Sequence, residues 1–136
     1  MDLIQGSDPA YHLLSSATVA TISSLELSGT KLYPVEIDPE GISGSVSGYQ
    51  GMAVIGRCGP IQQHRARDGS RVTAIGKTVP AKLGVYFERS TWDGSDFFMP
   101  SDSYGFVIAT LRARDAIEKA NLTNFRFMRT ADFVWR

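Results

Sequence analysis

The stretch TWDGSDFF at positions 91–98 places two carboxylates among three aromatic side chains. Asp93 and Asp96 are the right residue types to ligate a metal or to act as an acid and base pair, and Trp92 offers a stacking surface. A calcium loop beginning at Asp93 fails, because its twelfth position holds a tyrosine and not the closing glutamate. Asp-Gly is typical of a tight turn, after which Phe97 and Phe98 would return to the core.

Other candidate chemistries fail on spacing. The GKT at 76–78 resembles the end of a phosphate-binding loop, but arginine replaces the required glycine at 71 and Val-Pro follows in place of a helix. The GISGS at 41–45 lacks the last glycine of a nucleophile elbow. Cys58 and His64 could pair as thiol and base, although a cysteine after a strand is more often buried and inert. We therefore expect no catalytic residue, no metal site and no cofactor.

Charge is balanced overall but unevenly distributed. Lys+Arg and Asp+Glu are both 14, so no net positive charge draws the chain to nucleic acid. Segment 57–82 holds six basic residues against Asp68, whereas 88–102 holds four acidic residues against Arg89. Arginine forks suit carboxylates and phosphates. An alternative site, for a small anionic ligand in a binding or enzymatic domain, therefore comprises Arg57, His64, Arg65 and Arg67.

The elements that must position these residues indicate a single α+β domain over 1–136. Segments 11–37 and 106–130 each have the pattern of a strand, a helix and a strand. Ser15 or Ser16 would cap the first helix and Thr110 the second. The apolar residues of both helices recur at helical spacing. They are Val19, Ile22 and Leu25 in the first and Ala113, Ala116, Ile117 and Ala120 in the second.

After each predicted helix, a small polar pair is expected to turn the chain into a strand, Ser28-Gly29 in the first unit and Thr123-Asn124 in the second. The first strand would carry Leu32, Val35 and Ile37, and the second Phe125, Phe127, Phe133 and Trp135. Duplication and coincidence both explain the similarity of the two units, because any two strand-helix-strand units share this pattern.

Between these units lies a β-rich middle. Apolar runs predict short strands at 52–55, 71–75 and 83–87, and the glycine-rich stretch 40–51 reads as a loop or an edge hairpin. Prolines are expected at strand ends, because they cannot donate to a ladder. These prolines are Pro60, Pro80 and Pro100. The predicted architecture is a mixed or antiparallel sheet with two helices on one face.

The expected compartment is the cytoplasm, with no membrane partner. The chain begins without a charged and apolar leader pattern, and no segment approaches the ~20 apolar residues of a membrane span. The single cysteine, Cys58, has no intramolecular disulfide partner, which fits a reducing environment.

Several segments together resemble the Imm11-like (DUF1629) group of bacterial immunity proteins from polymorphic toxin systems, and the related double-CxxCG immunity proteins of myxobacteria. They are SDPAYHLLSS, LxLSGTKLYPVEI, GYQGMAVIGRCGPI, TWDGSDFF and RARDAIEKANLTNFRF. The likeness is strongest over 94–127. No CxxCG pair is present, so a metal site of those relatives does not transfer.

The resemblance implies a non-catalytic immunity protein that binds and neutralises a cognate toxin domain. On this reading an exposed aromatic and acidic patch would contact the toxin, and alanine at Asp93 and Asp96 should weaken binding without changing stability. The patch comprises Glu88, Trp92, Asp93, Asp96 and Asp102. A solvated turn without a partner and an adaptor subunit are the plainer alternatives. The oligomeric state is not predicted.

Overall fold

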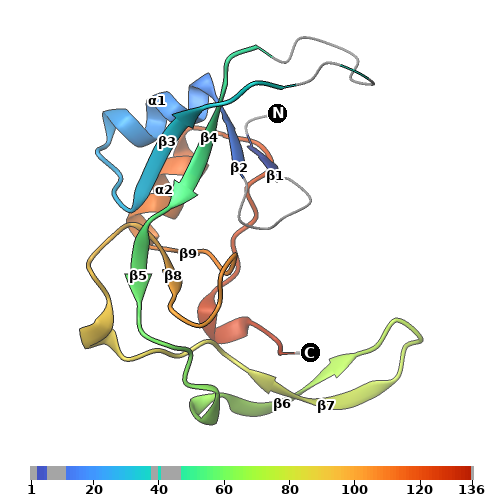
Figure 1. The fold of residues 1–136 in the computed structure, drawn as a ribbon. Helices are drawn as coiled ribbons and strands as arrows, with labels where there is room; N and C mark the ends of the chain where they lie inside the picture. Colours follow the sequence, from blue (N-terminus) through green and yellow to red (C-terminus); the bar gives the residue numbers. More distant parts are fainter. Residues whose placement is uncertain (1–2, 6–11, 38–39, 41–46, 136) are drawn as a thin grey trace.

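The computed structural model describes residues 3–5, 12–37, 40 and 47–135 and has two helices and three small sheets (Figure 1). The α+β expectation is confirmed. The helices are α1 (Ser16–Ser24) and α2 (Leu111–Lys119). The strands are β1 (Leu3–Gln5), β2 (His12–Ser15), β3 (Thr30–Pro34), β4 (Tyr49–Val54), β5 (Gly56–Cys58), β6 (Arg67–Val72), β7 (Thr78–Leu83), β8 (Phe97–Pro100) and β9 (Ile108–Ala109). Three single 3-10 turns are η1 (Gln63–Arg65), η2 (Arg89–Thr91) and η3 (Thr130–Asp132).

The largest sheet is antiparallel, with strand order β1-β2-β4-β3. Its inner positions, Leu14, Met52 and Val54, are buried, as the period of two in a strand requires. Gly51 lies opposite Tyr33, whose ring is so close that a Cβ at position 51 would overlap it at 2.2 Å. This glycine therefore lets the tyrosine ring lie flat on the sheet.

Both helices pack on the core of this sheet. Ser15 and Thr110 cap them as predicted, each hydroxyl accepting from a backbone N–H three residues later at 3.3 Å. Ile22 of α1 and Ile117 of α2 lie in the same apolar cluster as the strand side chains. Both predicted pairs contain a residue with positive φ, Gly29 (91°) and Asn124 (66°), but the chain first leaves the helices at Glu26 (49°) and Asn121 (52°). Only the first pair leads into a strand, β3.

Strand β8 joins this core to a second one. All its residues are buried, and successive side chains point to opposite faces. Phe97 and Met99 therefore enter the first cluster, whereas Phe98 enters the second with Cys58, Val85 and Ile108. The expectation that Phe97 and Phe98 anchor the core is confirmed.

The strands form three sheets because the chain bends between β4 and β5. The backbone N–H groups of Ile55 and Gly56 both donate to the Gly29 carbonyl, at 2.8 and 3.1 Å. A Cβ at position 56 would meet the Phe97 carbonyl at 2.2 Å. The small residue therefore allows β5 to leave the first sheet and to pair in parallel with β8.

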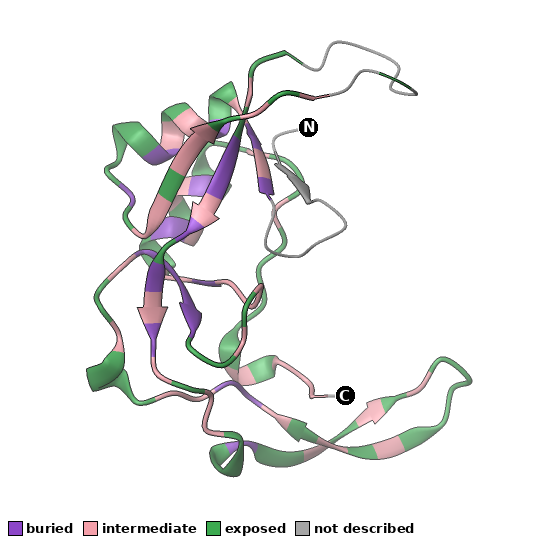
Figure 2. Cartoon of the chain, in the orientation of Figure 1, coloured by how far each residue is buried: buried purple, intermediate pink, exposed green. Residues whose placement is uncertain are grey.

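Strands β6 and β7 form a hairpin that projects from the body, away from both helices (Figure 1). None of their residues is buried (Figure 2). The sequence predicted only part of this element, at 71–75. Pro80, expected at a strand end, lies inside β7 opposite Ser70, because a two-stranded ribbon has an outer side on which no ladder donor is needed.

Two predicted strands are absent from the described part of the chain. Segment 83–87 is not a strand beyond Leu83, because Gly84 has a φ of 98° and the Val85 N–H donates to Thr130 in another segment. Segment 125–135 forms only an isolated bridge, Val134 to Leu83. Its alternating aromatic residues pack on the two cores without a ladder. Residues 41–46 of the expected loop, which include the GISGS stretch, lie outside the described residues.

Candidate functional site

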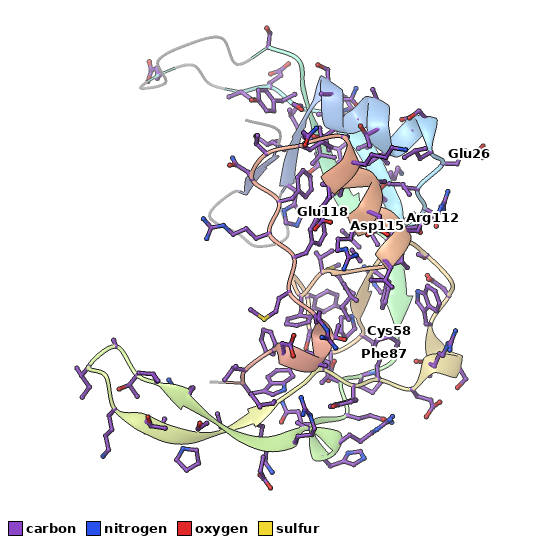
Figure 3. All side chains as sticks on the ribbon, turned by 180° about the vertical axis from the view of Figure 1, so that it is seen from behind. Glu26, Cys58, Phe87, Arg112, Asp115 and Glu118 are labelled. Atoms are coloured by element: carbon purple, nitrogen blue, oxygen red, sulfur yellow. The ribbon has the colours of Figure 1, made fainter. Side chains whose placement is uncertain are left out.

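Asp96 joins three elements from a buried position. Its carboxylate accepts from the Ser28 N–H at 3.0 Å, from the Thr110 hydroxyl at 2.8 Å and from the Arg112 guanidinium at 2.7 Å. Arg112 also donates to the Leu25 carbonyl, which ties α2 to the end of α1 (Figure 3). Burial by itself raises the pKa of Asp96, but these hydrogen bonds and the arginine charge outweigh it and leave the pKa below its usual value.

Asp96 is therefore a structural carboxylate with only 5% of its surface exposed. An alanine at this position would leave a part-buried N–H, a hydroxyl and a guanidinium without their acceptor, so unchanged stability is not the expected result. The sequence-based assignment of Asp96 to an exposed partner-binding patch conflicts with this burial.

The remaining patch residues hold the same turn together. Asp93 accepts from the Arg57 N–H at 2.8 Å and the Ser95 N–H at 3.0 Å, and Asp102 accepts from the Ile61 N–H at 3.1 Å. Burial raises the pKa of Asp93, but hydrogen bonds from Ser95 and Arg57 bring it below its usual value.

Trp92 donates from its indole N–H to the Ser95 carbonyl at 3.1 Å, and its ring lies 5.4 Å from that of Phe98. Glu88 is exposed beside η2. Only Glu88, Asp93 and Asp102 of the predicted patch are exposed, and two of these three accept structural hydrogen bonds. The structure does not bring the five residues into one open surface.

The three arginines of the alternative anionic site each have a structural partner. Arg57 donates to the backbone carbonyls of Val54 and Gly56, both at 2.8 Å. Arg65 lies over the Tyr86 ring, 5.4 Å from its centre. Arg67 donates to the carbonyl of Ala131 at 3.0 Å. These guanidiniums therefore have separate structural partners.

The proposed thiol, Cys58, and the proposed base, His64, differ in their exposure to solvent. Cys58 is buried in the second core, whereas His64 is exposed in η1 (Figure 3 labels Cys58). Burial, and then the charges of Asp102 and Asp93, raise the pKa of the Cys58 thiol, which disfavours the reactive thiolate. Among the described residues no cluster of three or more His, Cys, Asp or Glu side chains could hold a metal ion.

The projecting β6–β7 hairpin offers one open surface. It carries Val72 and Ile75, with 67% and 88% of their surfaces exposed. The turn is closed by a hydrogen bond from the Thr73 N–H to the Lys77 carbonyl at 2.8 Å, with Gly76 at a φ of 77°. Four basic side chains stand on the hairpin against one acidic residue. They are Arg67, Arg71, Lys77 and Lys82, against Asp68.

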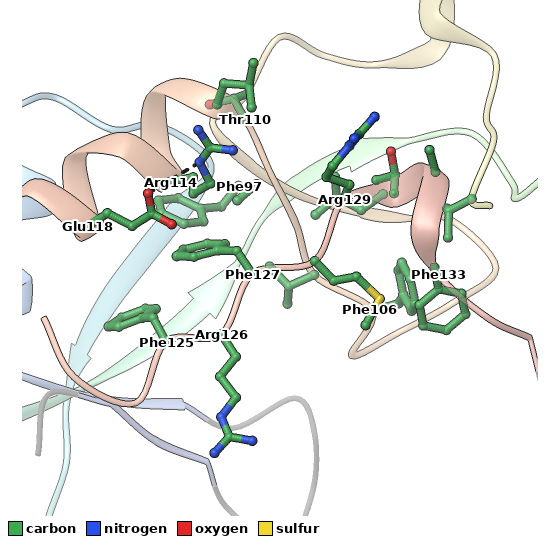
Figure 4. Close-up of a pocket in the computed structure, with 18 of the residues that line it drawn as sticks. Phe97, Phe106, Thr110, Arg114, Glu118, Phe125, Arg126, Phe127, Arg129 and Phe133 are labelled. Carbon is green, nitrogen blue, oxygen red and sulfur yellow. Dashed lines mark ion pairs between the residues drawn. The ribbon is translucent and has the colours of Figure 1, made fainter. Parts of the chain in front are cut away.

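A second open surface is a cavity of about 760 Å³ beneath the C-terminal segment (Figure 4). Its walls come from β8, β9, the start of α2 and residues 125–133. Phenylalanines from distant parts of the chain line it, namely Phe87, Phe97, Phe106, Phe125, Phe127 and Phe133. The rings of Phe125 and Phe127 are nearly parallel, 6.3 Å apart. The cavity thus has a largely aromatic wall.

The charged residues of this cavity are mostly cationic. Arg114, Arg126 and Arg129 line it, against the single acid Glu118. The Arg114 guanidinium lies 3.7 Å from the Glu118 carboxylate (Figure 4). It lies closer, at 2.6 Å, to the carboxylate of Asp115, a residue that does not line the cavity (Figure 3). Within the described chain, the backbone N–H groups of 125–128 donate to no protein acceptor. Because residues 126–128 are exposed, these N–H groups are open to solvent, and the cavity itself combines an aromatic wall with mostly cationic side chains.

His12 lies at the inner end of the same wall. It is buried, and its Nδ1 has no hydrogen-bond partner within the described structure. Burial lowers the pKa of its imidazole, which favours the neutral ring.

Sequence reasoning missed the cavity because its lining residues are spread from position 12 to position 133. The available signal was the alternation of Phe125, Arg126 and Phe127, which was interpreted as a strand. No protein-family model and no curated protein matches the chain. None of the described helices is long and apolar enough to cross a membrane.

Proposed function

We propose that this protein binds a partner protein through the β6–β7 hairpin, as an immunity protein that neutralises a cognate toxin domain. The observation that carries the proposal is the hairpin itself, which stands clear of both cores with a basic surface and an apolar tip. The toxin class of partner comes from the sequence resemblance described above. Binding and not catalysis is the proposed activity.

The hairpin has no buried face of its own. A two-stranded ribbon is marginally stable in water by itself, and this one has no buried side chain on either strand. Val72 and Ile75 leave apolar surface in water, and burying them against a partner would be favourable by about 25 cal/mol per Å². The outer edge of β6 can also pair with a partner strand, whereas Pro80 interrupts the outer edge of β7.

The charge of the hairpin defines the partner surface. The hairpin carries four basic side chains against one acidic residue, so a complementary partner would present a groove with acidic or carbonyl groups. The floor of that groove would be apolar, to match the apolar tip of the hairpin. This complementarity is opposite to that expected for the acidic patch around Asp93, which would have faced a basic cleft.

The test is co-expression with the toxin domain encoded next to this gene, followed by growth and by calorimetric titration of the purified pair. The variant combines Arg71→Glu with Lys77→Glu. The matched control combines Lys31→Glu with Arg89→Glu, two exposed basic residues outside the hairpin. We expect the control to protect cells and the hairpin variant to fail, with affinity reduced about a hundredfold or more because like charges then face each other.

Protection and affinity that are equal in the two variants would refute the hairpin as the interface. A lack of any protection by the unaltered protein would refute the immunity function itself. Circular dichroism of each variant establishes that the fold is retained.

A further inference from the structure

We infer that the cavity beneath residues 125–133 is a binding site for a small apolar anion, a carboxylate or sulfonate carried on an aromatic or acyl body. The site is separate from the hairpin surface and does not depend on the proposed toxin binding. No residue of β6 or β7 lines the cavity.

The apolar half of the ligand is specified by the walls. About 760 Å³ lies within the range of ~300–1,000 Å³ that small-molecule sites occupy. Phe97 is almost fully buried at the base of the cavity, whereas Phe127 is 37% exposed at its edge. Phe125 and Phe127 present nearly parallel rings, which leaves flat faces for an aromatic or acyl group (Figure 4).

The anionic half is specified by the donors. Arg129 is 78% exposed and reaches Asp132 only at 3.7 Å, so its guanidinium retains hydrogen-bonding capacity. Arg126 is exposed on the same segment, and its side chain extends to the opposite side of that segment from Arg129, so the two arginines offer alternative positions for the anion (Figure 4). Cationic forks next to an aromatic wall favour an amphipathic anion over a neutral or cationic ligand.

A macromolecular strand is a weaker fit to the same donors. The lining converges from β8, β9, α2 and the C-terminal segment on one concave volume, whereas an added strand requires a straight open edge. Glu118 is the one acid in the lining; it lies 3.7 Å from Arg114, and the lining holds three arginines against it.

The test uses two probes with one ring system. Anilinonaphthalene sulfonate carries the anion, and N-phenylnaphthylamine has the same body without it. We expect saturable fluorescence binding of the sulfonate by the unaltered protein at one site. In the variant with Arg126→Gln and Arg129→Gln, the sulfonate should bind about tenfold more weakly or worse, while the neutral probe is unaffected, because only the charge-assisted bonds are lost.

Three other variants distinguish binding in the cavity from nonspecific binding elsewhere on the surface. Ala131→Trp places a large ring within the cavity and should weaken the binding of both probes. Arg89→Gln removes an exposed arginine elsewhere, and the hairpin variant of Arg71 and Lys77 alters the other surface; both should bind the probes like the unaltered protein. Melting curves without probe exclude partly unfolded variants, which bind such dyes nonspecifically.

Equal sulfonate affinity in the double glutamine variant would overturn the anion assignment. Undiminished binding to the folded Ala131→Trp variant would overturn the cavity as the site. Loss of probe binding in the hairpin variant would also contradict the proposal, because it would place the dye on the hairpin.

Discussion

At the scale of single residues, Asp96 does more for the fold than any other acidic side chain in the TWDGSDFF stretch. It is the one carboxylate there that is both buried and bonded to a backbone N–H, a hydroxyl and a guanidinium. Its sequence neighbourhood gave no sign of this, because Ser28 lies 68 positions away.

Replacing Asp96 with alanine should lower the free energy of unfolding by about 1–3 kcal/mol, because it removes a buried carboxylate that accepts from three part-buried donors. The matched change Asp93→Ala removes an exposed carboxylate from the same turn and should cost about 1 kcal/mol. Urea unfolding of both variants measures the difference. Equal losses would show that the buried network is not a major source of stability.

The depressed pKa of Asp96 predicts a dependence of stability on acid. A carboxyl group whose pKa is lower in the folded state contributes stability above its unfolded pKa of about 3.9, and this is lost as pH falls through the lower folded value. The free energy of unfolding should therefore fall steeply below about pH 4. In Asp96→Asn the slope should be shallower, and an unchanged slope in urea titrations would contradict the assignment.

His12 predicts a second, separate window. Its pKa is lowered by burial, so the folded state favours the neutral ring and loses stability as pH falls below the unfolded value of about 6.5. Melting temperatures between pH 7 and 5 should decline in the unaltered protein and stay flatter in His12→Gln. A decline of the same size in both proteins would exclude His12 as its cause.

At the scale of elements, the start of α2 is the junction between the helix layer and β8. Thr110 accepts from the Ala113 N–H and also donates to Asp96. One hydroxyl therefore caps the helix and completes the carboxylate network, whereas Ser15 at the start of α1 caps its helix outside that network.

Thr110→Ala should lower the free energy of unfolding by about 1–2 kcal/mol, because it removes the cap and one bond to Asp96 together. Thr110→Ser keeps the hydroxyl and should stay close to the unaltered protein. Chemical denaturation with a circular dichroism signal compares the two. A serine variant as unstable as the alanine variant would assign the effect to the lost methyl group.

At the scale of the whole molecule, two packed cores joined through β8 carry a hairpin that belongs to neither core (Figures 1 and 2). The hairpin is attached at its base, where the Trp135 N–H donates to the Lys82 carbonyl at 2.9 Å. The C-terminal segment thus both anchors the hairpin and forms one wall of the cavity.

Hydrogen exchange should show this division directly. Backbone amides of β6 and β7 should exchange through local opening and be far less protected than those of β4 and β8, because the hairpin buries no side chain. Mass spectrometry of peptic fragments resolves these segments. Protection of the hairpin equal to that of β8 in the isolated protein would mean that it is held by contacts beyond its ladder and base.

The sequence by itself determined the local elements. Helical spacing and capping hydroxyls located both helices, and turn residues located Gly29 and Asn124, because these signals depend on neighbours within four positions. Runs of apolar residues located β2 and part of β4 for the same reason. The burial of Phe97 and Phe98 also followed from the sequence, since a run of large apolar residues after a tight turn must enter a core.

Only the tertiary structure decided which polar residues are open to a partner. In the sequence, Asp96 and Arg57 look like free charges. In the structure, Asp96 accepts a hydrogen bond from the distant Ser28 N–H, and Arg57 donates to the backbone carbonyl of Val54. Residues 125–135 alternate like a strand, yet only their end pairs, through the bridge from Val134 to Leu83 at the end of β7, and residues 125–131 line a cavity instead. Long-range contacts bring together residues whose separation no local pattern encodes, and for that reason both candidate surfaces emerged only from the fold.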